Sequence, residues 1–155
     1  MAREQKPGRF KYDLETVLKV RGIKERKERE RFADKQREYM TEKEKEELLE
    51  EEKKEREGEL KHIINKGPIT QFEKVLRRHA HLGVLRKDID EQIEKVIDAS
   101  KRLEDQRAKL IESMKDRKII EKNKEHRLGD YDKMMKDLEI KFLDEIATQR
   151  FKRGL

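Results

Sequence analysis

The sequence predicts an all-α protein, built as a long two-helix antiparallel coiled-coil hairpin with a C-terminal helical overhang. Half of the 155 residues are charged and only 32% are hydrophobic, so a conventional globular core is not expected. High charge with few aromatic residues is also typical of disorder, but the abundant Lys, Arg, Glu and Leu favour helices and the apolar residues recur at helical spacing. The two prolines, Pro7 and Pro68, leave room for two long uninterrupted helices.

The first helix is predicted over residues 13–65. Pro7 and Gly8 close a short basic leader, after which Asp13 can cap the helix. The apolar residues of this segment are sparse and irregularly spaced, so the helix would be marginal alone: Leu14, Val17, Leu18, Ile23, Phe32, Tyr39, Met40, Leu48, Leu49, Leu60, Ile63 and Ile64.

A tight turn over 66–69 separates this segment from a second helix, predicted over 70–152. Asn65-Lys66-Gly67-Pro68 is a compact break, and Thr70 with Glu73 forms a T-x-x-E capping box. We therefore expect residues 1–155 to form a single hairpin domain.

The second helix carries the clearest periodic pattern. Steps of three and four residues from Phe72 to Glu145 visit 22 positions, of which 14 are apolar. This heptad seam predicts a left-handed coiled coil with a partner helix. Its members include Val75, His79, Leu82, Arg86, Ile89, Ile93, Val96, Ser100, Leu103, Arg107, Leu110, Met114, Leu128, Tyr131, Met135, Leu138 and Phe142.

An antiparallel hairpin brings the two apolar patterns into register when the numbers of facing residues sum to about 135, as for Tyr39 and Val96. The charges agree near the turn, because residues 42–59 hold ten Glu against five Lys and Arg and would lie beside Arg77, Arg78, Arg86 and Lys87. The basic first 31 residues are expected to face a more acidic half of the second helix. Such pairs are individually weak, but they help to fix the register.

The second helix should outrun the first. A helix that begins near Asp13 has its last partner near residue 122, so residues 123–151 are predicted to lack an intramolecular partner. An apolar face continues there, with Leu138, Phe142, Ile146 and Phe151 expected to share it. Unpaired apolar faces usually bind another protein. Gly129 could be a flexible joint or a tolerated surface glycine.

Two terminal motifs resemble a known family. "FKYDLETVLKVRGIKE" at 10–25 and "LDEIATQRF" at 143–151 are similar to the opening and closing signatures of the flagellar FliJ family of the type III flagellar export apparatus. The resemblance implies an antiparallel coiled coil similar to the central stalk of rotary ATPases. It also implies three partners: a hexameric flagellar export ATPase, a membrane-embedded export gate and unloaded export chaperones. The Glu-rich run 42–59 departs from what is expected of the family.

From this resemblance we expect a non-enzymatic stalk and escort protein. The ATPase contact is predicted at Met135, Leu138, Phe142, Ile146 and Arg150, and the export-gate contact near the turn at Leu49, Leu76 and Leu85. The predicted location is the cytoplasm, at the inner face of the cell membrane at the flagellar base. The protein is expected to associate with the membrane only through its partners.

Other functions are less well supported. The sequence has no phosphate-binding G-x-x-x-x-G-K-[ST] loop and no nucleophile arrangement, so we expect no enzymatic activity and no cofactor. His79 and His81 lie two residues apart and point in different directions on a helix, which disfavours a metal site. Interleaved charges disfavour nucleic-acid binding. A generic coiled-coil scaffold remains an alternative.

Overall fold

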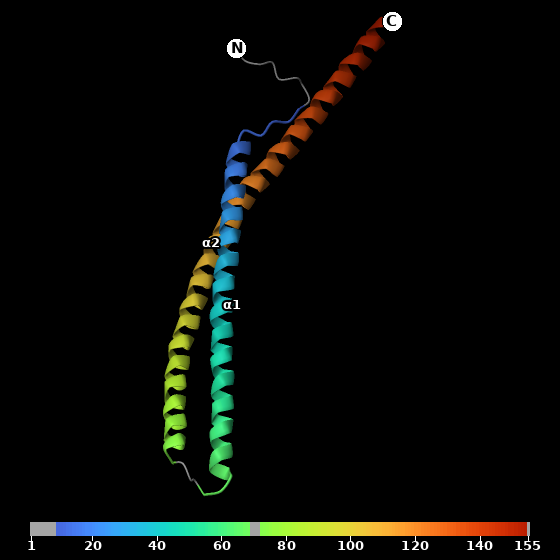
Figure 1. Cartoon of the computed structure of the whole chain (residues 1–155). Helices are drawn as coiled ribbons and strands as arrows, with labels where there is room; N and C mark the ends of the chain where they lie inside the picture. The colour runs from blue at the N-terminus through green and yellow to red at the C-terminus, as the bar shows by residue number, and fades with distance from the viewer. Residues whose placement is uncertain (1–8, 69–71, 155) are drawn as a thin grey trace. The chain divides into compact units, whose positions relative to one another are not determined.

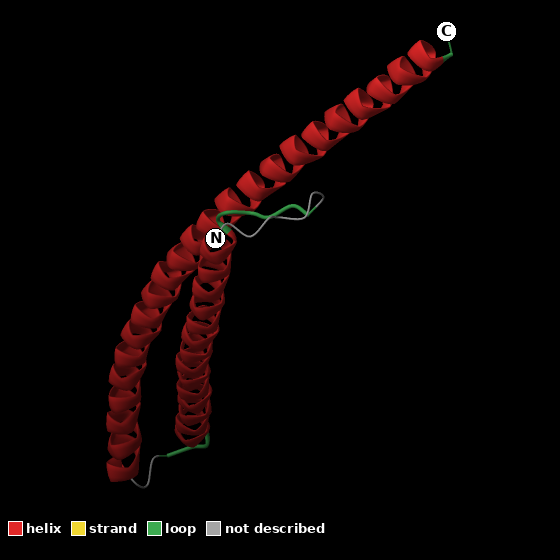
Figure 2. Cartoon of the chain, turned by 90° about the horizontal axis from the view of Figure 1, so that it is seen from above, coloured by secondary structure: helices red, strands yellow, loops and turns green. Residues whose placement is uncertain are grey.

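The structure, a computed structural model, describes residues 9–68 and 72–154 and consists of two long helices packed against each other. Helix α1 spans Glu15–Asn65 and helix α2 spans Phe72–Arg153. They run in opposite directions on either side of the turn (Figure 1), and the part of the chain that the structure describes contains no strand (Figure 2). The predicted all-α helical hairpin is confirmed.

Contacts divide the chain into two compact units. One comprises Lys27–Ile111 and contains the turn; the other combines residues up to Arg26 with those from Glu112 onward. We call them the turn unit and the terminal unit and describe each by itself. The single hairpin domain expected over 1–155 stays a prediction.

The turn begins directly after Asn65. Gly67 has a φ of 124°, a backbone conformation that residues other than glycine rarely adopt. The backbone conformation of the Asn65-Lys66-Gly67-Pro68 break therefore favours glycine at position 67. Thr70 of the predicted capping box, like the Pro7-Gly8 pair, lies outside the described residues.

The α2 side of the turn-unit interface follows steps of three and four residues, but half of the predicted seam is shifted by one residue. The buried positions are Leu82, Leu85, Ile89, Gln92, Val96, Ala99, Leu103 and Gln106. Arg86 and Arg107, which the apolar pattern had placed in the seam, are exposed, and Ile93 and Ser100 are half-buried. The seam includes small and polar side chains, which a search for apolar residues alone does not find.

The α1 side of the same interface is polar. The half-buried or buried positions at the same spacing include charged residues as well as aromatic or aliphatic ones: Glu28, Phe32, Lys35, Tyr39, Glu42, Glu46 and Leu49. This explains the irregular apolar pattern of the first helix, because Met40 and Leu48 point to solvent, with 55% and 65% exposed.

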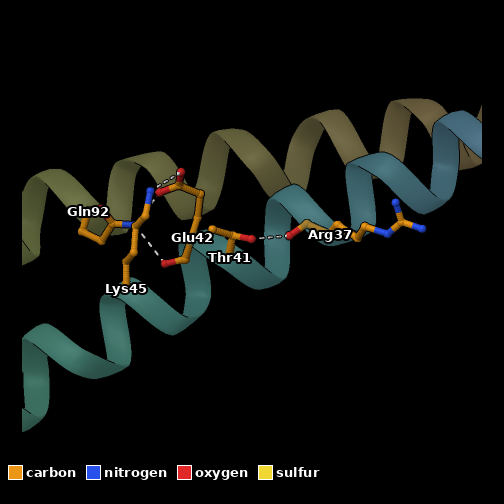
Figure 3. Close-up of polar contacts among 5 residues, drawn as sticks. All are labelled: Arg37, Thr41, Glu42, Lys45 and Gln92. Carbon is orange, nitrogen blue, oxygen red and sulfur yellow. Dashed lines mark hydrogen bonds and ion pairs between the residues drawn. The ribbon is translucent and has the colours of Figure 1, made fainter.

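Two repeated polar layers hold the helices together. In each, a glutamine amide of α2 donates to both the main-chain carbonyl and the carboxylate of one glutamate of α1. Gln92 binds Glu42 in this way, at 2.9 and 2.6 Å (Figure 3), and Gln106 binds Glu28. Both glutamines are buried. Because a buried polar group is costly without its partner, these layers favour one register.

The observed pairs agree with the predicted register. Gln92 with Glu42 and Gln106 with Glu28 are each within one residue of it. Closer to the turn, Arg78 pairs with Glu59 at 2.7 Å, as the predicted match of acidic α1 with basic α2 requires. The exposed Arg107 adds a cation–π contact between the helices, with its guanidinium carbon 5.4 Å from the centre of the Phe32 ring.

The Glu42–Gln92 layer should make stability sensitive to acid. The hydrogen bond from Gln92, its largest cause, lowers the pKa of Glu42 below its ordinary value of 4.5. A carboxylate with a lowered folded-state pKa contributes its full stabilisation above the unfolded pKa and loses it as the pH falls through the folded one. We expect Glu42→Gln to lose less stability than the wild type below pH 4.5, in urea unfolding followed by circular dichroism. Glu44→Gln, at an exposed position, is the matched control, and an unchanged acid dependence in Glu42→Gln would contradict the layer's role.

In the terminal unit the same two helices pair again. Here the acidic partners come from α1 and the basic partners from α2, which is the opposite of the prediction. The predicted match was of basic α1 with acidic α2, but Glu15 of α1 pairs with Lys124 at 2.8 Å and Glu25 pairs with Arg117. Glu25 is only 5% exposed, so α1 turns an acidic residue inward. Lys19, Lys24 and Arg26 are exposed, whereas Arg21 is half-buried and donates to the main-chain carbonyl of Asp116 at 2.7 Å.

Candidate partner-binding surface

The first described residues form a clip over α2. Residues 9–14 precede the helix, and Tyr12 among them is only 8% exposed. Its hydroxyl donates to Asn123 Oδ1 at 2.6 Å, with the carbonyl oxygen of Ile120 as a second acceptor at 3.3 Å. Asp13, the predicted cap, lies in the turn just before α1.

Contacts between aromatic rings extend this clip. The Phe10 ring lies 5.5 Å from that of Tyr131 and 6.5 Å from that of Tyr12, and the groove beside these rings reaches Met134. We call Phe10, Tyr12 and Tyr131 the aromatic clip. The prediction that everything from Asn123 onward lacks a partner is therefore wrong: a non-helical segment continues the coverage of α2 to about Tyr131. This segment was not predicted because apolar periodicity identifies helical partners, and residues 9–14 are not helical.

Beyond the clip, α2 exposes a large apolar surface, which we call the overhang surface (residues 135–153). Leu138 and Phe142 are 52% and 62% exposed, and with Met135 they line a shallow groove. Met135 and Ile146 are half-buried, and Arg150 is exposed. All five residues predicted to contact an ATPase thus lie on this surface.

The overhang surface has a second apolar face that the sequence prediction missed. Ile140, Leu143 and Phe151 are 57%, 57% and 73% exposed. At about 100° per residue, Ile140 points roughly 200° away from Leu138, to the opposite side of the helix. The same spacing places Phe151 with Ile140 and Leu143, so the expectation that Phe151 shares a face with Leu138 is wrong. The signal was present in the sequence as a second three-and-four spacing through residues 140, 143, 147 and 151.

Helix α2 is uninterrupted at the boundary of this surface. Gly129 lies within continuous helix, and a Cβ atom added there would meet no other atom within 4 Å. A flexible joint at this glycine stays a prediction.

The residues predicted for an export gate have unequal exposure. In the turn unit Leu76 is 53% exposed, Leu49 is half-buried and Leu85 is 3% exposed within the seam. Leu76 thus offers most of the accessible apolar surface of this set, together with Phe72, which is 62% exposed. His79 and His81 are both exposed.

These features define a class of protein: a helical hairpin that extends one helix past its partner and exposes apolar side chains on two faces of it. Such a molecule is suited to binding another protein. The family model described as "Flagellar FliJ protein" matches residues 10–155, and the chain belongs to this family. The match begins at Phe10 of the aromatic clip and includes the overhang surface. It identifies the chain as a component of the flagellar export apparatus.

No curated protein and no solved structure showed significant similarity to the chain. Among the described residues, neither helix contains a stretch that is apolar enough to cross a membrane.

Proposed function

We propose that the chain is a non-enzymatic, stalk-like partner of the hexameric flagellar export ATPase, and that the overhang surface enters the ATPase ring. The observation that carries this proposal is the pair of opposed apolar faces on one helix. A helix with one apolar face fits a groove, whereas a helix that is apolar on opposite sides must be covered on both. A ring that surrounds the helix provides such a covering.

The energetics favour a specific contact. Burial of a large apolar side chain contributes about 1.5–3 kcal/mol before the costs of ordering and association. Leu138, Phe142 and Phe151 are each more than half exposed, so most of this contribution is still available to a partner. Arg150 would place a charge at the end of the contact.

The proposal also includes an export-gate contact near the turn and the binding of export chaperones. An export-gate contact would use the apolar residues near the turn, above all Leu76 with its neighbour Phe72, both exposed. The escort of unloaded export chaperones is a further part of the proposal. These contacts would hold the protein in the cytoplasm, at the inner face of the membrane at the flagellar base.

Substitution of the first apolar face tests the ATPase contact. We expect Leu138→Ala and Phe142→Ala each to weaken binding to the purified cognate ATPase by about tenfold, because each removes about 1.4 kcal/mol or more of apolar burial. Biolayer interferometry measures the dissociation constants.

The matched control is Leu48→Ala, which removes an exposed leucine, 65% accessible, from the turn unit. It should leave the dissociation constant unchanged. A loss below about twofold in both overhang variants, or an equal loss in the control, would reject the overhang surface as the ATPase contact.

A further inference from the structure

Three arginines and one histidine from both helices line a groove near the turn. They are Arg56 of α1 and Arg77, Arg78 and His81 of α2, and we call this the arginine groove. We propose that the arginine groove binds carboxylate groups of an acidic segment of a partner protein. This site lies in the turn unit and is independent of the proposed ATPase contact.

The groove already shows which anion its geometry accepts. Arg56 and Arg78 share the carboxylate of Glu59, at 3.4 and 2.7 Å. Guanidinium groups match the planar carboxylate, and charge-assisted hydrogen bonds of this kind are stronger than neutral ones. The intramolecular Glu59 carboxylate therefore serves as a model of the ligand.

Arg77 provides the free binding capacity. It is exposed, and it forms no ion pair with any carboxylate among residues 9–68 and 72–154. It stands next to Arg78 in the chain and lines the same groove, so an incoming carboxylate can bind Arg77 beside the existing pairs. His81, whose Nε2 lies 3.9 Å from Glu52, adds a fourth hydrogen-bonding group.

The neighbouring carboxylates favour a singly charged group over a phosphate. Glu59 pairs with Arg78 and Glu52 lies 3.9 Å from His81, so both carboxylates repel an incoming anion in proportion to its charge. A peptide carboxylate carries one charge, whereas a phosphate group at neutral pH carries about two. Several carboxylates spaced along an acidic segment could also each bind a different arginine of the groove.

The adjoining surface supports a protein as the source of the carboxylates. Leu76, directly before Arg77, is 53% exposed, and Phe72 one helical turn earlier is 62% exposed. Apolar and cationic side chains thus alternate within two turns at the start of α2. A partner segment that carries both acidic and apolar residues would match this arrangement.

The test uses the full chain and a fluorescently labelled hexaglutamate peptide, with hexaglutamine as the uncharged control, in anisotropy titrations at low salt. We expect hexaglutamate to bind and hexaglutamine not to bind. Arg77→Gln should weaken hexaglutamate binding by about fivefold, which is near the upper range for one exposed ion pair. Arg102→Gln, which removes the same charge from an exposed position elsewhere on α2, should weaken it less than twofold.

Three results would overturn the proposal. The first is an absence of hexaglutamate binding. The second is an equal effect of the two arginine substitutions, which would show general attraction to a basic protein. The third is displacement of the labelled peptide by inorganic phosphate at least as effectively as by unlabelled hexaglutamate, which would make the groove a phosphate site. Because the titration contains no ATPase, its outcome does not depend on whether the overhang surface binds the ATPase.

Discussion

Replacement of Gln106 by leucine should destabilise the protein by about 1–3 kcal/mol, because a buried carboxylate then loses its hydrogen-bond donor. Gln106 donates to the Glu28 carboxylate and, at 3.3 Å, to the Glu28 carbonyl oxygen. Glu28 is only 7% exposed, so water cannot fully replace the lost donor. Arg31, which donates to Glu28 at 2.9 Å, remains and keeps the loss below that of an isolated buried charge.

The double variant Glu28→Leu/Gln106→Leu should recover most or all of this stability. It replaces the polar layer with an apolar one, and such exchanges are often neutral or stabilising. Urea unfolding of the four members of this double-mutant cycle measures the coupling between the two residues. Gln36→Leu makes the same chemical change at an exposed site of α1 and should shift stability by no more than about 0.5 kcal/mol. Additive losses in the double variant would show that the two side chains do not act as one layer.

The recovered stability should come with a loss of register specificity. Cysteines at Tyr39 and Val96, which face each other in the predicted register, should form an intramolecular disulfide in an otherwise unchanged chain. In the double variant we expect a lower yield of this disulfide, since one of the two polar layers that penalise a shifted register is gone. An unchanged yield would mean that apolar packing alone sets the register.

The fold was predictable from the sequence because its signals are local. Gly67 and Pro68 mark the turn, and one half of the α2 seam, including Leu82, Ile89, Val96 and Leu103, follows directly from apolar spacing. Each of these signals depends on backbone geometry and on side chains that avoid water.

The polar half of the interface was not predictable in the same way. Glu28 and Gln106 are residue types that usually lie on the surface, and only the contact between them makes their burial acceptable. The apolar spacing therefore predicted Arg107, one residue away, for the seam, but Arg107 is exposed. Burial of a polar residue in the seam can be predicted only when the residue that it contacts on the partner helix is known.

The candidate site was predicted in part. The exposed stripe through Leu138 and Phe142 follows from the heptad pattern once the pairing helix ends. The clip could not be derived from it, because Phe10 and Tyr12 lie outside any helix, where periodicity gives no information. The opposite face, with Ile140 and Leu143, was visible as spacing but was not predicted, and Phe151, which belongs to it, was assigned to the Leu138 stripe.

Removal of the overhang surface should abolish the effect of the protein on its ATPase while leaving its own fold intact. Deletion of residues 135–155 keeps Tyr131 and thus the whole aromatic clip, whose contacts with α2 end near Met134. The deleted segment contains both apolar faces. The unfolding midpoint should therefore change little, while the segment that we propose to enter the ring is lost.

The most direct test is the steady-state ATP hydrolysis rate of the purified export ATPase, measured with the full chain and with the chain lacking 135–155. We expect stimulation by the full chain and none by the truncated one, with circular dichroism showing that both are folded. Phe10→Ala in the full-length chain is the matched control, because it loosens the clip and keeps both faces of the overhang surface. Stimulation by the truncated chain equal to that of the full chain would contradict the insertion of the overhang surface into the ring.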